Sequence, residues 1–508
     1  MPNTAWIKDD FDPAVAVAER AAPSMAAVAA SPSPPVADAN AVATSPGCGH
    51  DAVRVLDAWR ARNPYYHRRL TEYLRFIIPE GESVLMIGCE DGAMLSALRP
   101  SRGVGIDHPD ELIACARRRH PDHEYATAPG YAFRVDGRFD YVVINDVMDQ
   151  VHDVFALLQY VATRCVPTSR VIVIQPNYLW RPVHRMVPWL GAKLLRARSN
   201  LLSAGDLSVI LQGVGFETID IRPKLFCPWQ FCGIGSAVNW VGGLLPFSHR
   251  LASTNILVAR PDVQDPHPAD KSASIVMAMR DERENVEPMV RAIPEVGRRT
   301  EILIVEGHSR DGTREEIGRV IEAYPQKNIR LVKQSGSGVA NAIFEGFTAA
   351  TGDVIILLEA DRTSPPEDVL KVFDIIASGR ADYVNGSRFI YPREQGAMPF
   401  PNVLGNALFA AWFMWFLGQR TSDVLCGLKG IDRRHFQRVL KHWGFLGVVD
   451  PFSDFEMVFG AARLGLKICE VPTRYTKRRY GRSKTRFFKH GWMLARMAAR
   501  ATRIFRCR

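Results

Sequence analysis

The chain has 508 residues, which is too many for one hydrophobic core and predicts two or three domains. Its content of 47% hydrophobic and 23% charged residues is ordinary for folded protein and excludes a chain that is mainly disordered. The nine cysteines are scattered without a CxxC pair, which argues against a zinc site or a disulfide framework and favours a reducing, cytosolic compartment. No run of eighteen apolar residues occurs, so a membrane-spanning helix is not expected.

The net charge of +10 is concentrated near the C-terminus. Thirteen of the 64 Lys and Arg residues lie in 474–508, which has no Asp or Glu, so the rest of the chain has 51 basic against 54 acidic residues. A localised cationic segment predicts an anionic partner, which can be phosphate groups, membrane lipid or nucleic acid.

Residues 1–50 are rich in Ala, Pro, Ser and Val without periodicity and are interpreted as a disordered arm. The segment 51–262 then alternates helical and strand patterns, with a helix at about 92–99. Its strands are expected at 83–87, 103–107, 139–144 and 170–174. This alternation predicts an α/β unit with a parallel sheet and right-handed crossovers.

A turn that contains two glycines follows the first of these strands, and an acid ends the second. The turn reads Gly88-Cys-Glu90-Asp-Gly92, and the second strand ends at Asp107. A turn of this kind lets the backbone approach a cofactor, and a strand-end acid accepts ribose hydroxyls.

With 139–146 and the later Gly215-Phe-Glu, this unit resembles the class I S-adenosylmethionine-dependent methyltransferases. The resemblance implies S-adenosylmethionine as cofactor, bound at Gly88, Glu90, Gly92 and Asp107. Glu90 stands where the family usually has glycine, so either the loop shifts or the unit binds the cofactor poorly. No catalytic base for methyl transfer is identifiable.

Three prolines between 261 and 268 indicate a linker, taken as 263–271. A second α/β unit is expected over 272–485. Its strands fall near 274–278, 301–305, 329–333, 354–358 and 382–386, and its helices near 286–296, 313–323, 338–350 and 366–378.

The strand over 354–358 ends in Glu359-Ala-Asp361, two carboxylates spaced i, i+2. Side chains at this spacing in extended chain point the same way, here at the carboxyl end of a strand, where open α/β sheets bind ligands. Two carboxylates suit a hard divalent cation, which in turn suits a diphosphate. A solvated acidic turn after a core strand would give the same pattern. Glu282 and Glu306 follow the two earlier strands and are candidate acceptors for a nucleoside.

The order and spacing of these motifs over about 272–490 resemble the inverting nucleotide-sugar glycosyltransferases of family 2, with the GT-A fold. The likeness is to the dolichol- or polyprenol-phosphate sugar transferases. The matching segments are Ala278-Met-Arg-Asp-Glu282-Arg-Glu-Asn285, Glu306-Gly-His-Ser-Arg-Asp311-Gly-Thr313, Glu359-Ala-Asp361-Arg-Thr-Ser-Pro365-Pro366, Asn385-Gly-Ser-Arg388-Phe389, Asp423-Val-Leu-Cys-Gly427 and Tyr475-Thr-Lys-Arg478-Arg-Tyr-Gly-Arg-Ser-Lys484.

The resemblance implies that Glu282 and Glu306 hold the nucleoside of the donor. It also implies that Asp361, with Glu359, holds Mg²⁺ or Mn²⁺ against the diphosphate. Glu replaces the usual Asp at both 306 and 359, which lengthens the reach by one methylene. Arg280 replaces an aromatic residue and could face a phosphate or stack on the base.

By the same resemblance, phosphates would be clamped by Arg388, Arg478 and Lys484. A lipid phosphate acceptor is already an anion and needs no strong base, whereas a sugar hydroxyl needs one. Asp454 is then the first candidate for a general base and Asp423 the second, although both could be structural hydrogen-bond partners.

Two segments suggest membrane contact. The stretch 404–417 is strongly apolar but short, and it could equally be a core helix. The tail 486–508 mixes basic and apolar residues at helical spacing, which predicts an interfacial helix on an anionic membrane surface. The protein is therefore expected at the inner face of the membrane as a peripheral, cytoplasmic protein, and nucleic acid is not an expected partner.

The sequence thus predicts an α/β chain with two Rossmann-like units, an N-terminal class I methyltransferase-like fold and a C-terminal GT-A fold. The expected function is metal-dependent inverting transfer of a sugar from a nucleotide-sugar to a polyprenyl-phosphate or glycan acceptor. Methyl transfer as the principal activity is one alternative. A membrane-bound scaffold with a degenerate methyltransferase unit is the other.

Overall fold

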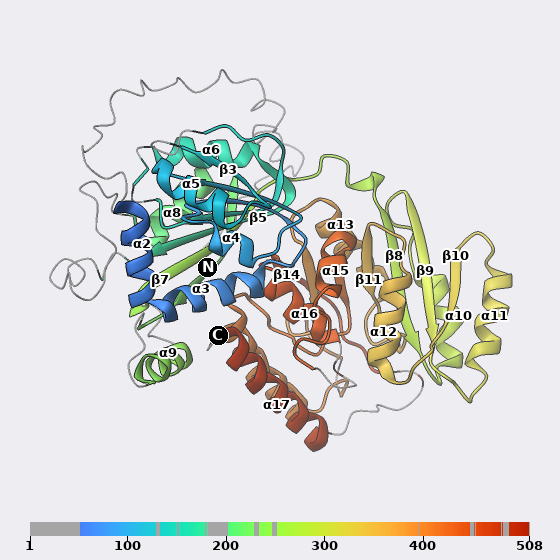
Figure 1. Cartoon of the computed structure of the whole chain (residues 1–508). Coiled ribbons are helices and arrows are strands. Elements are labelled where there is room, and N and C mark those ends of the chain that lie inside the picture. Colours follow the sequence, from blue (N-terminus) through green and yellow to red (C-terminus); the bar gives the residue numbers. More distant parts are fainter. Residues whose placement is uncertain are drawn as a thin grey trace, which may run out of the picture. The chain divides into compact units, whose positions relative to one another are not determined.

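The computed structural model describes residues 51–506 except 129–132, 149, 152, 178–179, 181–201, 228–232, 246–250, 395, 448–451, 453, 479 and 481–486. The arm predicted over 1–50 lies outside the described residues, as does Lys484. Figure 1 shows the helices and strands in chain order.

The first sheet has seven strands in the order β3-β2-β1-β4-β5-β7-β6. Its strands are β1 (Ser83–Ile87), β2 (Arg102–Asp107), β3 (Glu124–Thr127), β4 (Phe139–Asn145), β5 (Cys165–Pro176), β6 (Phe216–Lys224) and β7 (Thr254–Pro261). The helices of this half are α2 (Asp51–Arg62), α3 (Pro64–Ile77), α4 (Ala93–Ala97), α5 (Asp110–Arg119), α6 (Val154–Thr163), α8 (Ala204–Gly213) and α9 (Ile234–Leu244).

All four strands predicted in this half are confirmed, but the prediction of a purely parallel sheet is wrong. The strand β7 runs antiparallel to both of its neighbours, β5 and β6. Because β6 and β7 are antiparallel neighbours, the rule that crossovers are right-handed, which concerns parallel strands, does not apply to their connection.

The second sheet also has seven strands, in the order β10-β9-β8-β11-β13-β12-β14. Its strands are β8 (Ser272–Met279), β9 (Arg299–Glu306), β10 (Asn328–Lys333), β11 (Val354–Leu357), β12 (Tyr383–Ser387), β13 (Lys429–Asp432) and β14 (Ile468–Pro472). The helices are α10 (Arg283–Ala292), α11 (Thr313–Ala323), α12 (Gly338–Ala349), α13 (Val369–Ala377), α14 (Phe400–Leu417), α15 (Arg433–Leu440), α16 (Asp454–Arg463) and α17 (Phe487–Arg506). The five predicted strands are confirmed, and β13 adds an antiparallel strand between β11 and β12.

The strand β11 shows why its sequence is a continuous apolar run. All four of its residues are buried, and alternate ones belong to different cores: Ile355 and Leu357 to one apolar cluster, Val354 and Ile356 to another. Side chains that alternate across a sheet covered on both faces must all be apolar. Figure 1 shows helices beside both faces of this sheet.

A single apolar cluster and a buried ion pair join the two halves. The cluster contains Ile172 of the first sheet and Phe459 of α16 in the second half. The guanidinium of Arg170, 1% exposed, donates to Asp382 Oδ2 at 2.6 Å and to the Gly465 carbonyl at 2.8 Å. A fragment that ends near residue 262 would expose this surface, so binding experiments need the whole chain.

The helix α17 corrects the prediction for the C-terminal tail. Its apolar residues Leu494, Ala498 and Phe505 are buried in the same cluster as α14. The apolar face of α17 is therefore part of the protein core and is not available for lipid. Its exposed positions carry Arg496 and Arg500, together with Trp492, which is 68% exposed.

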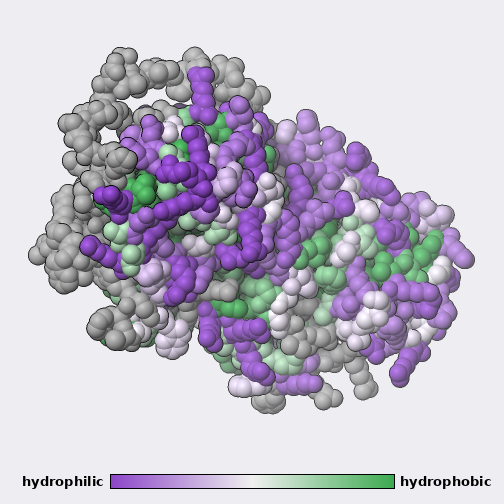
Figure 2. All heavy atoms as spheres, viewed as in Figure 1, coloured by the Kyte–Doolittle hydropathy of each residue, from purple (hydrophilic) through white to green (hydrophobic). Residues whose placement is uncertain are grey.

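The helix α14 is long and apolar enough to cross a membrane by length and composition, and no other helix in the described residues is. About a quarter of it (28%) is buried, which agrees with a helix packed on one side only. Over the face of the protein seen in Figure 2, hydrophilic residues predominate and hydrophobic residues form smaller patches.

Candidate functional site

Three parallel strand ends bring the acidic residues of the second half together. The strands β9, β8 and β11 are adjacent and parallel, with Met279 paired to Glu306 and Leu357 to Val276. The segments that follow β8 and β11 carry Glu282 and Asp361. Their carboxyl ends therefore meet at one edge of the sheet, as the sequence predicted.

The carboxylates of Glu359 and Asp361 are linked through one hydroxyl. Thr363 Oγ1 lies 2.6 Å from Asp361 Oδ1 and 3.4 Å from Glu359 Oε2, and the Thr363 backbone N–H also donates to Asp361 Oδ1 at 3.0 Å. Arg362, which lies between Asp361 and Thr363 in the sequence, has a φ of +60° and turns the chain sharply after the strand. The i, i+2 spacing thus places both carboxylates beside the same threonine.

The side chain of Glu359 packs directly against the backbone of Gly427. A Cβ atom at Gly427 would lie 2.2 Å from Glu359 Cγ, so only glycine leaves room for the longer acid. Burial, together with the nearby charge of Asp361, raises the pKa of Glu359 to about 7. A cation beside Glu359 would favour its charged form, because opposite charge lowers a carboxyl pKa.

The side chain of Arg478 lies between the carboxylates that follow β8 and β11. Its guanidinium forms an ion pair with Asp361 Oδ2 and lies 3.6 Å from Glu282 Oε1. Glu282 also accepts a hydrogen bond from Asn285 Nδ2 at 2.6 Å. Arg478 thus places one positive charge between the carboxylates of Asp361 and Glu282.

The remaining residues expected to hold the nucleoside differ in their exposure. Glu306 is buried and accepts a hydrogen bond from the Ser309 backbone N–H at 2.6 Å. Arg280 is exposed at the end of β8, and its Nε lies 3.8 Å from Asp281 Oδ2. Arg280 is therefore exposed to solvent beside the strand end, whereas Glu306 is buried.

Asp423, the second candidate base, has the environment of a structural hydrogen-bond partner, which was the alternative interpretation of this residue. Its carboxylate is fully buried and accepts five hydrogen bonds: three from the backbone N–H, Nε and Nη2 of Arg388, one from Asn406 Nδ2 and one from the Leu425 backbone N–H. Burial acts to raise its pKa, but Arg388 holds the pKa below its usual range. A carboxylate with this many donors and a depressed pKa is unsuited to be a general base, so Asp423 instead orients Arg388.

Asp454, the other candidate base, has a different environment. It begins α16, and its Oδ2 lies 3.4 Å from Lys429 Nζ. Burial raises the pKa of Asp454, and Lys429 opposes this. A raised pKa makes this carboxylate a better proton acceptor, which is compatible with a general base.

Sequence reasoning missed Lys429 and Asn406. Lys429 is fully buried in β13, where its Nζ donates to Asn385 Oδ1 at 2.8 Å. A fully buried lysine is rare unless it is paired, but β13 reads Lys-Gly-Ile-Asp, so no apolar run marked the burial of this lysine. Asn406 lies in an apolar helix and was not marked by any motif.

The carboxylate pair fits a Mg²⁺ or Mn²⁺ ion that is shared with a substrate. No group of three or more His, Cys, Asp or Glu side chains in the described part of the chain could hold a metal by itself. Mg²⁺ in phosphate-transfer sites is commonly held by one or two carboxylates plus substrate phosphates and water. Glu359 and Asp361 supply those two carboxylates.

The first half carries a second candidate site at its topological switch point, between β1 and β4. Gly88 and Gly92 have φ values of +84° and +82°. A Cβ at Gly88 would lie 2.3 Å from the Asn145 carbonyl oxygen, so the turn after β1 requires glycine there. Ligands of open α/β sheets bind at such switch points.

Glu90 keeps the left-handed backbone of this turn. Its φ is +55°, and its backbone N–H donates to Asp107 Oδ2 at 2.6 Å. Its carboxylate pairs with Arg60 of α2 at 2.9 Å, and Asp91 pairs with the same arginine. The loop therefore accommodates Glu90 without losing its contact to Asp107, and three carboxylates line this edge of the sheet. Carboxylates accept hydrogen bonds, so Asp107 at this edge fits a cofactor that bears a ribose.

Comparison with known proteins identifies both halves. Residues 274–439 match the family model Glycosyl transferase family 2, and residues 58–221 match the model Methyltransferase domain. A dolichol-phosphate mannosyltransferase of Pyrococcus furiosus is 33% identical over 25% of this chain and 36% of its own length. The glycosyltransferase AglJ of Haloferax volcanii is 32% identical over 35% of this chain and 54% of its own length. The chain thus spans about half or less of the length of these relatives.

A solved structure is similar to part of the chain. Magnesium protoporphyrin IX methyltransferase from Synechocystis is 14% identical, with 42% of this chain and 96% of that chain covered and a TM-score of 0.31.

Proposed function

Because the chain carries a family 2 glycosyltransferase domain in its C-terminal half and a methyltransferase domain in its N-terminal half, we propose that it transfers a sugar from a nucleotide-sugar to a polyprenyl phosphate at a membrane surface. The transfer inverts the anomeric carbon. The observation that carries this proposal is the meeting of Glu282, Glu306 and Asp361 at one sheet edge, with Arg478 between two of them.

Donor binding begins with an exchange of partners at Arg478. In the absence of donor, this guanidinium neutralises Asp361 and faces Glu282. When the donor enters, Glu282 and Glu306 accept hydrogen bonds from the nucleoside. Arg478 then turns from the carboxylates to the diphosphate, for which a guanidinium fork is well suited.

A Mg²⁺ or Mn²⁺ ion held by Asp361 and Glu359 would neutralise the charge that develops on the departing nucleoside diphosphate. Arg388 adds a positive charge that is fixed in place, because Asp423 holds its Nε and Nη2 and leaves Nη1 for a phosphate oxygen. A cation that is already oriented costs no reorganisation when the phosphate charge develops.

The acceptor determines whether a base is needed. A lipid phosphate attacks as an anion, so Asp454 and Lys429 would then only set the local charge. For a glycan hydroxyl, the alternative acceptor, Asp454 would remove the proton at its carboxylate. The dolichol- and polyprenol-linked names of the relatives favour the lipid phosphate.

Membrane contact is proposed through α14. One side of this helix exposes Phe400 (76%), Leu404 (52%) and Leu408 (65%), while Asn406 on another side bonds Asp423 at 2.8 Å. An apolar stripe on the helix that also supports the site would hold a lipid-borne acceptor close to it. The protein would thus be peripheral at the inner face of the membrane.

A turnover assay tests the proposal. The full chain is incubated with polyprenyl phosphate and a panel of UDP- and GDP-sugars, with and without Mn²⁺. Product that needs acceptor and metal, persists in Asp353→Asn and is lost in Asp361→Ala supports it. Full activity in Asp361→Ala, or no product with any donor of the panel, refutes it. Asp353 is a matched control because it precedes β11 while Asp361 follows it.

A second activity is favoured by one observation in the first half. Asp107 ends β2, the neighbour of β1, and contacts the glycine turn after β1, as a ribose-binding acid would. We propose that this half binds S-adenosylmethionine. When bound, that cofactor supplies an electrophilic methyl group. Asp107 would accept hydrogen bonds from its ribose, and the glycines Gly88 and Gly92 would let the backbone of the turn approach it.

A further inference from the structure

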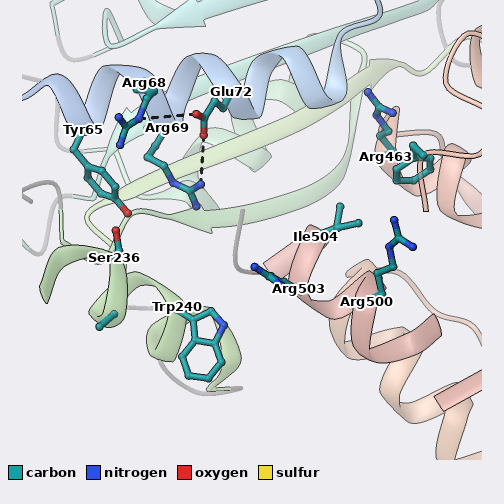
Figure 3. Close-up of a pocket in the computed structure, with 12 residues that line it drawn as sticks. Tyr65, Arg68, Arg69, Glu72, Ser236, Trp240, Arg463, Arg500, Arg503 and Ile504 are labelled. Atoms are coloured by element: carbon teal, nitrogen blue, oxygen red, sulfur yellow. Dashed lines mark hydrogen bonds and ion pairs between the residues drawn. The ribbon is translucent and has the colours of Figure 1, made fainter. Parts of the chain in front are cut away.

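A large basic cavity lies apart from both sites. It has a volume of about 1080 Å³ and is formed by side chains of α3, α9, α16 and α17 together with Phe445. Figure 3 shows arginines from α3, α16 and α17 around this space, with Trp240 of α9 beside it. Asp454 of the acidic site and Arg463 of the cavity stand at opposite ends of α16, about 14 Å apart at 1.5 Å per residue.

The lining of the cavity has an excess of positive charge. It contains five arginines, Arg68, Arg69, Arg463, Arg500 and Arg503, and one acid, Glu72. Glu72 pairs with Arg69 at 3.4 Å and more loosely with Arg68 at 3.9 Å. Within the described part of the chain, no carboxylate lies within ion-pair distance of Arg500 or Arg503.

One of these arginines is built into the protein. Arg463 is 7% exposed, and its Nε donates to the Phe76 carbonyl. Its guanidinium also lies over the rings of Phe76 (4.7 Å) and Phe445 (4.9 Å). This fixes its orientation while it lines the cavity, which is how a preorganised anion site is made.

A buried lysine near the cavity reports the same excess. Lys224 is 8% exposed, and its Nζ donates to the Phe505 carbonyl at 3.0 Å. Burial, followed by the charges of Arg222, Arg506 and Arg69, lowers the pKa of Lys224 to about 7. These arginines place positive charge beside the cavity, and a bound anion would offset it.

The rim of the cavity is apolar on one side. Trp240, 52% exposed, lines the cavity, and α9 also exposes Ile234 (57%), Val238 (43%) and Val241 (46%). A basic pocket beside an exposed apolar helix matches a ligand with an anionic head and a hydrocarbon chain.

We infer that this cavity binds the phosphate group of a lipid, with the head among Arg463, Arg500 and Arg503 and the chain along α9. The site is distinct from the proposed transfer site, and its test does not depend on glycosyl transfer. The lipid phosphate can come from a polyprenyl phosphate or from an anionic phospholipid of the membrane.

Titration calorimetry on the full chain tests the inference with soluble probes. These are dihexanoyl phosphatidic acid, geranyl phosphate, dihexanoyl phosphatidylcholine and inorganic phosphate. The two lipid phosphates are expected to bind at least about tenfold more tightly than either of the others. Tighter binding of geranyl phosphate than of phosphatidic acid points to a polyprenyl phosphate. Equal binding of the two points to a phospholipid.

Binding measurements on variants test whether the lipid phosphate binds in this cavity. The exposed double change R500Q/R503Q should weaken binding of the lipid phosphates by about tenfold or more, whereas R496Q, an exposed arginine of the same helix outside the cavity, should change it less than about twofold. If the double variant does not fold, R503Q alone serves. Trp240→Ser should weaken lipid binding but leave inorganic phosphate binding unchanged. Equal binding of phosphatidylcholine and phosphatidic acid, or an equal loss in R496Q, would overturn the inference.

Discussion

Arg478 and Asp361, which are 117 residues apart in the sequence, form an ion pair at the carboxyl edge of the second sheet. The same guanidinium lies 3.6 Å from Glu282, so one flexible cation spans two strand ends. A donor diphosphate and its metal ion would compete for these partners, because a guanidinium pairs with phosphate and a carboxylate with the cation. The ion pair thus offsets part of the negative charge of the carboxylates at this edge of the sheet.

The buried pair of Asp423 and Arg388 predicts a large effect on stability. Asp423→Asn should lower the free energy of unfolding by about 3–5 kcal/mol, because it leaves the Arg388 charge buried without its partner. Urea unfolding measures this. Asp374→Asn breaks an exposed pair with Arg380 and should cost only about 0–1 kcal/mol. Equal effects of the two changes would contradict the role given to Asp423.

The apolar stripe of α14 predicts where the protein touches lipid. Changing both Leu404 and Leu408 to Glu should reduce binding to anionic liposomes by about tenfold or more, because charged side chains replace exposed apolar area. Co-sedimentation measures the bound fraction. Val209→Glu is the control, since Val209 is 69% exposed on α8 of the other half. The proposal fails if the α14 variant still binds as the native chain does.

The sequence predicted this fold well where local pattern decides, and less well where tertiary contacts decide. The apolar run before Glu359 could only be a strand covered on both faces, and the i, i+2 spacing placed Glu359 and Asp361 beside one hydroxyl. The pairing of Asp423 with Arg388 joins residues 35 positions apart and depends on Asn406 of another element. No local pattern records such a contact.

The C-terminal helix α17 also shows that a local pattern does not reveal which tertiary contacts form. Basic and apolar residues at helical spacing predicted an interface with lipid, but Leu494, Ala498 and Phe505 face the protein core instead. A hydrophobic stripe shows that one face of a helix is covered without showing what covers it. Lys429 is a further case, because its burial and its bond to Asn385 depend on tertiary contacts that the short strand Lys-Gly-Ile-Asp does not record.

His442 predicts a dependence of stability on pH. Burial, with the nearby charge of Arg463, lowers the pKa of His442 to about 4 in the folded chain. An unfolded histidine titrates near 6.5, so between about pH 4 and 6.5 the unfolded state binds the extra proton and the folded state does not. Stability should therefore fall as the pH is lowered from 7 to 5. His442→Gln should flatten this slope in thermal unfolding, and an unchanged slope would contradict the prediction.

Glu90 predicts how the first half responds to a smaller side chain. Glu90→Gly should tighten binding of S-adenosylmethionine to the full chain by about fivefold, because glycine lets the ligand approach the turn and adopts its positive φ without strain. Glu90→Gln keeps the size and should not tighten binding. Asp107→Ala should abolish it. Equilibrium dialysis with labelled cofactor measures all three, and unchanged binding in Glu90→Gly would show that Glu90 does not obstruct the cofactor.

The central claim is that Asp361 and Glu359 hold a divalent cation against a nucleoside diphosphate. Titration of Mn²⁺ into the full chain with GDP or UDP present tests it most directly. The account predicts one bound ion in the native chain and in Asp353→Asn, and at least about 100-fold weaker binding in Asp361→Ala. Undiminished Mn²⁺ binding in Asp361→Ala would contradict it.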